Sequence, residues 1–147
     1  AITTFFLLLG FNGETEGCLK QERETLMKLK DVFNYPNGSS LASWNNLTSF
    51  SDCCTWEALE CDNSTKRVIR LHLNDKRANE LRHIKWSLNV SSFLPLHHLQ
   101  ELELSGNYLS GLFGDIRMAS LVVLELEDNM LTEFPSFGAK SLASTFF

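Results

Sequence analysis

The sequence predicts an α/β solenoid in which short parallel strands stack one on the next, behind an N-terminal cap that is helical and held by disulfides. Two stretches of the chain repeat each other with one spacing of leucines, which is typical of a solenoid. The stretch before them has the apolar period of a helix, and all four cysteines precede the repeats. A chain of 147 residues has room for one such domain.

The composition excludes binding to nucleic acid and a complete membrane span. A net charge of −5 and a pI near 5.3 do not supply the basic surface that a phosphate backbone requires. No run of about 18 apolar residues is present. An apolar content of 44% is ordinary for a globular protein, so we expect a packed core.

The first residues have the pattern of a signal-peptide remnant. The run AITTFFLLLGF suits the core of a secretory signal and is too short to span a bilayer. Thr15 and Gly17 place small residues at −3 and −1 of a cleavage site before Cys18. We interpret residues 1–17 as the remnant of a signal whose true start is missing; the alternative is a buried N-terminal strand or helix.

Residues 18–33 have the pattern of an amphipathic helix that ends before Pro36. Its apolar residues recur at helical spacing with charged residues between them: Leu19, Leu26, Met27, Leu29, Val32 and Phe33. The segment 39–44 then predicts a second short helical turn, opened by a serine cap.

The cysteines lie at Cys18, Cys53, Cys54 and Cys61. A bond between the two adjacent cysteines is disfavoured, because disulfides usually span about 4.4–6.8 Å between Cα atoms and chain neighbours lie about 3.8 Å apart. Two pairings remain open. Both tie the Cys18 region to the adjacent pair and close a small loop that ends at Cys61.

A zinc site is the alternative use of these thiols, with Cys53, Cys54, Cys61 and His72 as a Cys₃His set. The usual C-x₂₋₄-C spacing of zinc ligands is absent, and a secretory compartment oxidises thiols. We therefore expect no metal and no other cofactor. Four N-x-[ST] sequons indicate the same compartment and predict N-glycosylation at Asn37, Asn46, Asn63 and Asn89.

The repeats begin at Leu99 and Leu121, with an offset of 22 residues at every aligned position. The aligned residues are Leu99, Leu102, Leu104, Asn107 and Leu109 in the first copy, and Leu121, Leu124, Leu126, Asn129 and Leu131 in the second. This L-x-x-L-x-L-x-x-N-x-L pattern is the leucine-rich repeat. The two asparagines fall where the chain leaves its strand, so their amides can bond the backbone of neighbouring turns as a ladder.

A weaker third copy lies upstream in VIRLHL, which aligns Leu71 and Leu73 with the strand leucines of the next repeat, 31 residues later. The excess length falls in RANELRHIKWSLN, residues 77–89, which we interpret as a lateral insertion. The predicted order is therefore strand, insertion and two regular repeats.

The residues that alternate with the strand leucines should point away from the core. In this architecture they line the concave side of the sheet, which is here called the strand face. It comprises Arg70, His72 and Asn74, then Glu101, Glu103 and Ser105, then Val123, Glu125 and Glu127. Because neighbouring strands lie about 4.8 Å apart, we expect His72, Glu103 and Glu125 to form a column in which the carboxylates raise the pKa of the histidine. The strand face is either the start of a ligand-binding surface or a polar edge beside the cap.

We expect no enzymatic activity. The strand glutamates alternate with buried leucines, so they are better explained as a solvated face than as an acid–base pair. Ser105 lies in LSGN, which is not a G-x-S-x-G nucleophile elbow.

The order of motifs resembles the N-terminal end of plant extracellular leucine-rich-repeat receptor-like proteins and, more distantly, plant polygalacturonase-inhibiting proteins. The order is a cysteine before QERETLMKLK, then LASW, DCCTWEALECD and RVIRLHL, then the repeats. The resemblance covers about residues 18–135, with a cap at 18–66, a strand, insertion and repeats at 67–135, and an irregular tail at 136–147. Where the family usually has W-x-G-V-x-C, this chain has Ala58 and Leu59 in place of glycine and valine.

The resemblance implies disulfides Cys18–Cys53 and Cys54–Cys61. It also implies a recognition module at the plant cell surface, with a protein, peptide or glycan ligand, a co-receptor kinase as a further partner, and a role in signalling or defence. Membrane attachment would come only from a missing C-terminal helix. The alternatives are an inhibitor of a secreted hydrolase that degrades the cell wall, and a truncated fragment without a function of its own.

Overall fold

The computed structural model describes residues 17–45, 52–115 and 117–132, together with a strand at 143–145. The signal-like residues before Gly17 and the sequon at Asn46 lie outside this part of the chain. Within the described ranges, no helix is both long and apolar enough to cross a bilayer.

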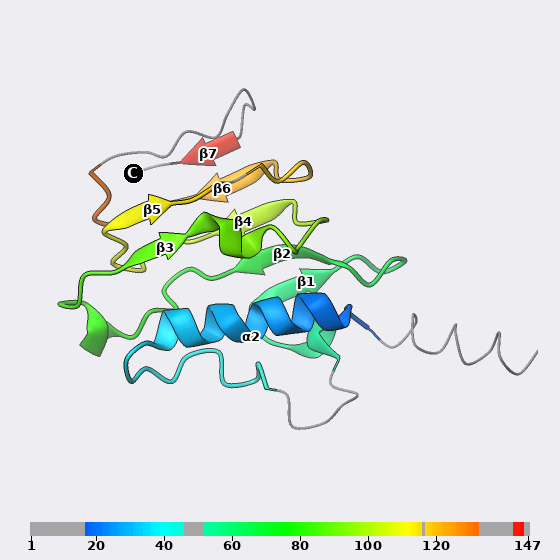
Figure 1. Cartoon of the computed structure of the whole chain (residues 1–147), viewed down its shortest axis with the longest axis horizontal. Helices are drawn as coiled ribbons and strands as arrows, with labels where there is room; N and C mark the ends of the chain where they lie inside the picture. Colours follow the sequence, from blue (N-terminus) through cyan, green and yellow to red (C-terminus); the bar gives the residue numbers. More distant parts are fainter. Residues whose placement is uncertain (1–16, 46–51, 116, 133–142, 146–147) are drawn as a thin grey trace, which may run out of the picture.

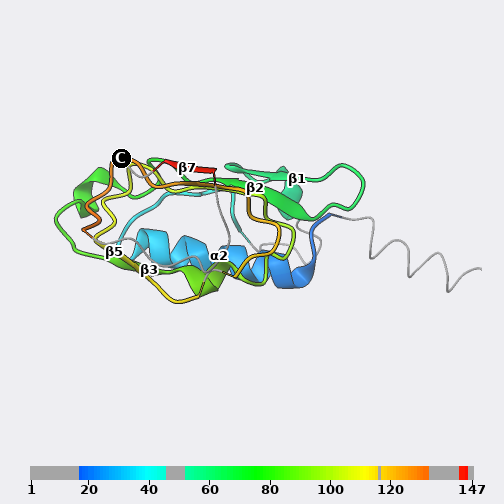
Figure 2. The ribbon, with the colours of Figure 1, turned by 90° about the horizontal axis from the view of Figure 1, so that it is seen from above.

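Two layers enclose one core (Figures 1 and 2). One layer is a five-stranded sheet in the order β1-β2-β4-β6-β7. Its strands are β1 (Leu59–Cys61), β2 (Val68–His72), β4 (Glu101–Glu103), β6 (Val123–Glu125) and β7 (Ala143–Thr145). The other layer holds helix α2 (Lys20–Asn34) and a two-stranded parallel sheet of β3 (Ser87–Asn89) and β5 (Gly111–Phe113). Short 3₁₀ turns are η1 (Cys53–Thr55), η2 (Asn79–Leu81) and η3 (Val90–Phe93).

The predicted strand register is confirmed. The parallel strands β2, β4 and β6 align Leu71 with Leu102 and Leu102 with Leu124. These three leucines are buried, whereas the residues on either side of them in each strand are only half-buried. From the opposite layer, the apolar face of α2 completes the core with Leu26, Leu29 and Phe33.

The predicted asparagine ladder is also present. The Asn107 side chain, fully buried, accepts hydrogen bonds at Oδ1 from the backbone N–H groups of Lys76 and Arg77 at 3.0 and 2.9 Å. Its Nδ2 donates to the carbonyls of Leu73 and Leu104 at 2.7 and 3.0 Å. One side chain therefore satisfies backbone groups of two consecutive turns.

Asn129 repeats the arrangement one turn later. Its Oδ1 accepts from the backbone N–H groups of Asn107 and Leu109, both at 3.0 Å. Its Nδ2 donates to the carbonyls of Leu104 and Leu126 at 2.9 and 3.1 Å. The ladder thus continues along the solenoid with the same atoms in the same roles.

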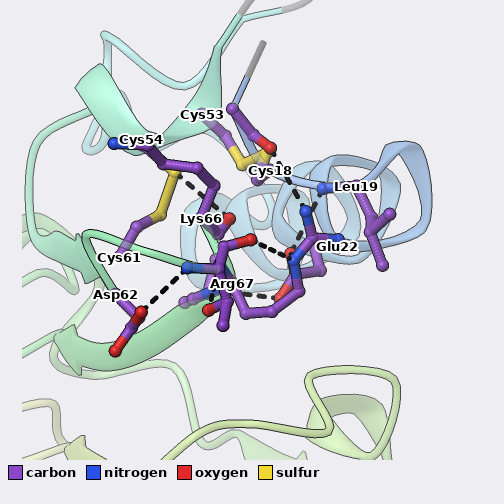
Figure 3. A network of polar contacts seen from close by, with 12 residues as sticks. Cys18, Leu19, Glu22, Cys53, Cys54, Cys61, Asp62, Lys66 and Arg67 are labelled. Atoms are coloured by element: carbon purple, nitrogen blue, oxygen red, sulfur yellow. Dashed lines mark hydrogen bonds and ion pairs between the residues drawn. A yellow bond between two sulfur atoms is a disulfide. The ribbon is translucent and has the colours of Figure 1, made fainter. Parts of the chain in front are cut away.

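Two disulfides hold the cap together, and one buried carboxylate attaches it to β2 (Figure 3). Cys18 bonds Cys53 and Cys54 bonds Cys61, the pairs that the resemblance implies. All four cysteine sulfurs are therefore in disulfides, and the zinc alternative has no thiolates to use.

The carboxylate belongs to Glu22, which lies in the first turn of α2 and is 1% exposed. Its Oε1 accepts from the backbone N–H of Leu19 at 3.2 Å and lies 4.0 Å from Nε of Arg67. Its Oε2 accepts from the backbone N–H of Val68 at 3.0 Å, at the start of β2. The same side chain therefore accepts hydrogen bonds from the backbone N–H at the N-terminus of the helix and from the first backbone N–H of the strand.

Three sequence interpretations are corrected by the structure. Segment 39–44 forms a turn, closed by a hydrogen bond from the N–H of Trp44 to the carbonyl of Leu41 at 3.0 Å, and not a helix. The insertion 77–89 is not only lateral, because it ends in β3, which pairs with β5. The tail 136–147 is not wholly irregular, because it contains β7, parallel to β6.

We predict that Asn107→Ala lowers the free energy of unfolding by about 3 kcal/mol. The substitution leaves several buried backbone groups without partners, each at a cost of about 1–3 kcal/mol. Asn129→Ala is the matched control, with a smaller loss, because its site is partly open to water that can replace the amide. Urea unfolding of both variants measures the difference; equal losses would contradict this account of the ladder.

We also predict that Ala58→Gly stabilises the protein by about 0.5–1 kcal/mol. Ala58 has φ +64°, a left-handed conformation that suits glycine and strains an L-residue. It stands where the resembling family has glycine, which accounts for that family's choice. Ala78, with φ −59°, is the control, and Ala78→Gly should destabilise by about 0.5 kcal/mol. Thermal melts that shift both variants downward would refute the strain at Ala58.

Candidate functional site

The strand face is the side of the five-stranded sheet away from the core. In-register pairing sets Arg70 beside Glu101, which in turn lies beside Val123. A second row runs from His72 through Glu103 to Glu125 in the same way. All six side chains are half-buried, as their alternation with buried leucines requires.

A charged cluster occupies the end of the strand face nearest the cap. Nε2 of His72 lies 2.6 Å from Oε2 of Glu60, and Nδ1 faces Oε2 of Glu103. Arg70 places Nε 3.2 Å from Oε2 of Glu101 and Nη1 3.8 Å from Oε1 of Glu60. Two basic side chains are therefore interleaved with three carboxylates.

Glu60 was missed in the sequence because it belongs to the cap and not to a repeat. It reaches the cluster because β1 pairs antiparallel with β2, opposite Arg70. Its position between buried Leu59 and disulfide-bonded Cys61 is the one signal that could have found it, since alternate residues of a strand share a face.

The pKa of His72 is raised, as predicted, but one predicted partner is wrong. Burial lowers the pKa of His72, and hydrogen bonds to Glu60 and Glu103 outweigh that effect. The second carboxylate is Glu60 and not Glu125, which lies one strand beyond Glu103. The hydrogen bond to His72 in turn lowers the pKa of Glu60.

Further from the cap the strand face changes character. In the described part of the chain, Glu125 and Glu127 form no ion pair, unlike the carboxylates of the charged cluster. Asn74, which the sequence places on the strand face, accepts a hydrogen bond from the N–H of Ser105 at 2.8 Å and so serves the backbone. Along the strand face, the charges nearest the cap are therefore paired with each other, and the two carboxylates furthest from the cap have no ion-pair partner in the described part of the chain.

Three of the four sequon asparagines lie on described surface. Asn37 and Asn63 are exposed in turns, and Asn89 is exposed at the end of β3. Asn89 Oδ1 accepts from the N–H of Ser91 at 3.0 Å, which leaves its Nδ2, the atom that carries a glycan, unused by this bond. Glycosylation at Asn37, Asn63 and Asn89 stays a prediction, as it does at Asn46.

The groups of the charged cluster satisfy one another. His72, which the strand face presents, has both ring nitrogens engaged by carboxylates and so lacks a free nitrogen for proton transfer. What the strand face offers is a set of fixed charges with fixed spacing across adjacent strands.

We predict that Glu60→Gln and Glu103→Gln each bring the pKa of His72 down towards its ordinary 6.5, whereas Glu125→Gln leaves it nearly unchanged. NMR titration of the His72 ring measures the midpoint. Because the folded-state pKa lies above 6.5, the stabilisation from imidazolium is complete below that pH and is lost as pH rises through the folded pKa. A midpoint that responds to Glu125→Gln as strongly as to Glu60→Gln would contradict the cluster.

Comparison with known proteins agrees with this architecture. The family model described as leucine rich repeat N-terminal domain matches residues 19–62. Receptor-like protein 14 of Arabidopsis thaliana is 31% identical over 147 aligned residues, which cover 88% of this chain and 14% of that protein. Receptor-like protein 9b of Arabidopsis thaliana is 35% identical over 122 residues, 76% of this chain and 12% of that protein.

Cuscuta receptor 1 of Solanum lycopersicum is 35% identical over 112 residues, 75% of this chain and 10% of that protein. The chain therefore spans between 10% and 14% of the length of these three relatives. With its disulfide-held cap, its leucine repeats and these matches, the chain belongs to the family of plant leucine-rich-repeat receptor-like proteins, and it corresponds to their N-terminal cap and first repeats.

Proposed function

We propose that the strand face is the beginning of an extracellular surface that binds a protein or peptide ligand. The observation that carries the proposal is a change along this face. The charges beside the cap pair with each other, whereas Glu125 of β6 and Glu127 just after it form no ion pair in the described part of the chain. Charges already paired with each other have little left to offer a ligand, whereas Glu125 and Glu127 keep their full hydrogen-bonding capacity. A ligand with basic side chains complements them.

The relatives support a receptor-like role outside the cell. Two are named receptor-like proteins, and a third is named a receptor. Solenoids bind over extended surfaces, so the short face described here would supply one end of a longer one. In a protein of the relatives' length, further repeats would continue that surface, and a membrane anchor and a co-receptor kinase would complete a signalling role, including one in defence.

The cap has its own part in this function. Glu60 of β1 engages His72 and approaches Arg70, so the cap adds a carboxylate to those that β4 already supplies to these basic residues. The cap thereby ends the surface: because Glu101 and Glu103 of β4 are also paired, ligand contacts are expected to begin at β6 rather than at β2 or β4. The ligand-binding part of the strand face is therefore expected to extend away from the cap, starting at the first carboxylate without an ion-pair partner.

The test is a binding measurement on the 147-residue chain made in an oxidising host. Synthetic lysine- and arginine-containing peptides, and acidic peptides of equal length, are titrated against it by isothermal calorimetry. We expect the basic peptides to bind better, and the double variant Glu125→Lys, Glu127→Lys to weaken them by about tenfold.

A charge-matched control separates the strand face from net charge. Glu24→Lys with Glu80→Lys changes the total charge equally at two exposed positions elsewhere. These changes should leave affinity nearly unaffected at physiological salt. Equal losses in both double variants, or no preference for basic peptides, would overturn the proposal.

A further inference from the structure

A pocket of about 360 Å³ opens between the C-terminal end of α2 and the start of β3, away from the strand face. Its lining combines two charged rim residues, one serine, one buried arginine and four large apolar side chains. They are Asp31, Val32, Tyr35, Arg77, Ile84, Lys85, Trp86 and Ser87. The volume lies within the range of small-molecule sites, about 300–1,000 Å³.

The apolar lining is more exposed than a core requires. Tyr35 is 71% exposed, and Val32 and Ile84 are each 39% exposed. Scattered apolar residues on a surface need no explanation, but three around one concavity form a place where an apolar molecule can leave water.

Arg77 is the group that gives the pocket its chemical character. It is 3% exposed, and its Nη1 donates to the carbonyls of Val32 and Phe33 at 3.4 and 2.9 Å. These carbonyls end α2, whose last turn has no basic residue of its own, so the guanidinium supplies the favourable charge there. The other two nitrogens of the guanidinium, Nε and Nη2, do not contact these carbonyls.

Nε and Nη2 of Arg77 are buried and have no hydrogen-bond partner in the described structure. These two nitrogens form the edge of a guanidinium that donates two parallel N–H groups, the geometry that fits both oxygens of a carboxylate. Unpaired buried donors are rare and destabilising. Burial also lowers the pKa of Arg77, as expected of a cation without a counter-charge.

The pocket wall is fixed before any ligand arrives. Trp86 stacks under the guanidinium, with Cζ of Arg77 4.4 Å from the ring centroid. Its Nε1 donates to the carbonyl of Asn107 at 2.8 Å, and its ring packs edge-to-face against Phe33 at 5.2 Å. Val32 and Ile84 are each 39% exposed, and a ligand that reaches the buried edge of the guanidinium would have to displace side chains at the mouth of the pocket.

We propose that this pocket binds a small organic acid, with its carboxylate on Nε and Nη2 of Arg77 and its apolar body against Val32, Ile84 and Trp86. The rim favours a single negative charge, because Lys85 offsets Asp31 and Arg77 remains as the net cation. Arg77, Ile84, Lys85 and Trp86 all come from the insertion 77–89, so the site belongs to the segment that departs from the regular repeat.

The experiment uses 2-naphthoate as the probe and 2-naphthamide as its neutral counterpart, titrated against the full chain by ¹H–¹⁵N NMR. We expect the acid to bind at least about tenfold more tightly than the amide and to shift the Nε–H signal of Arg77. Ile84→Glu, which places a carboxylate at the mouth, should weaken the acid by about tenfold. Val122→Glu, at an apolar residue that is 54% exposed elsewhere, should not.

Arg77→Lys keeps the positive charge but removes the two parallel N–H donors of the guanidinium, and it should abolish the preference for the acid. An unchanged Trp86 indole signal verifies that the wall is intact; if the variant fails to fold, Ile84→Glu and its control still decide. Absence of binding at millimolar 2-naphthoate, equal affinity for acid and amide, or equal effects of Ile84→Glu and Val122→Glu would each overturn the proposal. Those results would mean that water alone satisfies Nε and Nη2 of Arg77. Because the strand face takes no part in this test, its outcome is independent of the peptide-binding proposal.

Discussion

Where the chain turns away from a strand of this solenoid, its backbone N–H and carbonyl groups lose their partners in the sheet. The buried side-chain amide of Asn107 supplies the missing hydrogen bonds between two consecutive turns. The consequences extend beyond the ladder. The same Oδ1 fixes the N–H of Arg77, and the backbone carbonyl of Asn107 holds the indole of Trp86. Arg77 then closes the C-terminus of α2. The repeat, the insertion and the cap helix therefore all depend on one residue in the core.

Charge is distributed unevenly over the two layers. On the strand face, Glu60 of the cap and Glu101 and Glu103 of β4 share the basic groups of β2. The carboxylates that form no ion pair in the described part of the chain therefore lie further from the cap. On the opposite layer, the insertion contributes cations beside α2. One of them, Arg77, donates hydrogen bonds from Nη1, whereas its Nε and Nη2 have no partner in the described structure. The two faces would thus present opposite charge to different ligands, a peptide on one and a small acid on the other, from opposite sides of the leucine core.

The sequence predicted those features that follow from a repeated pattern. The leucine spacing determined which residues pair across β2, β4 and β6, and the asparagine spacing predicted the ladder. Strand β7 escaped prediction because Ser144 stands opposite Leu124, where the repeats have leucine. Glu60 escaped because an antiparallel hairpin, not a repeat, brings it to the strand face. The Arg77–Trp86 pair escaped because an insertion without a period gives no indication of which side chains turn inward.

Glu22 joins positions that are 46 residues apart, because its carboxylate holds the first turn of α2 and the first amide of β2 together. Neither end of that link can open alone without leaving a buried charge uncompensated. We therefore expect the cap helix and the first strand to unfold together. The bond between them needs both segments, because Glu22 belongs to the helix and Val68 to the strand. The cap, although first in the chain, is finished only with the start of the solenoid that it covers.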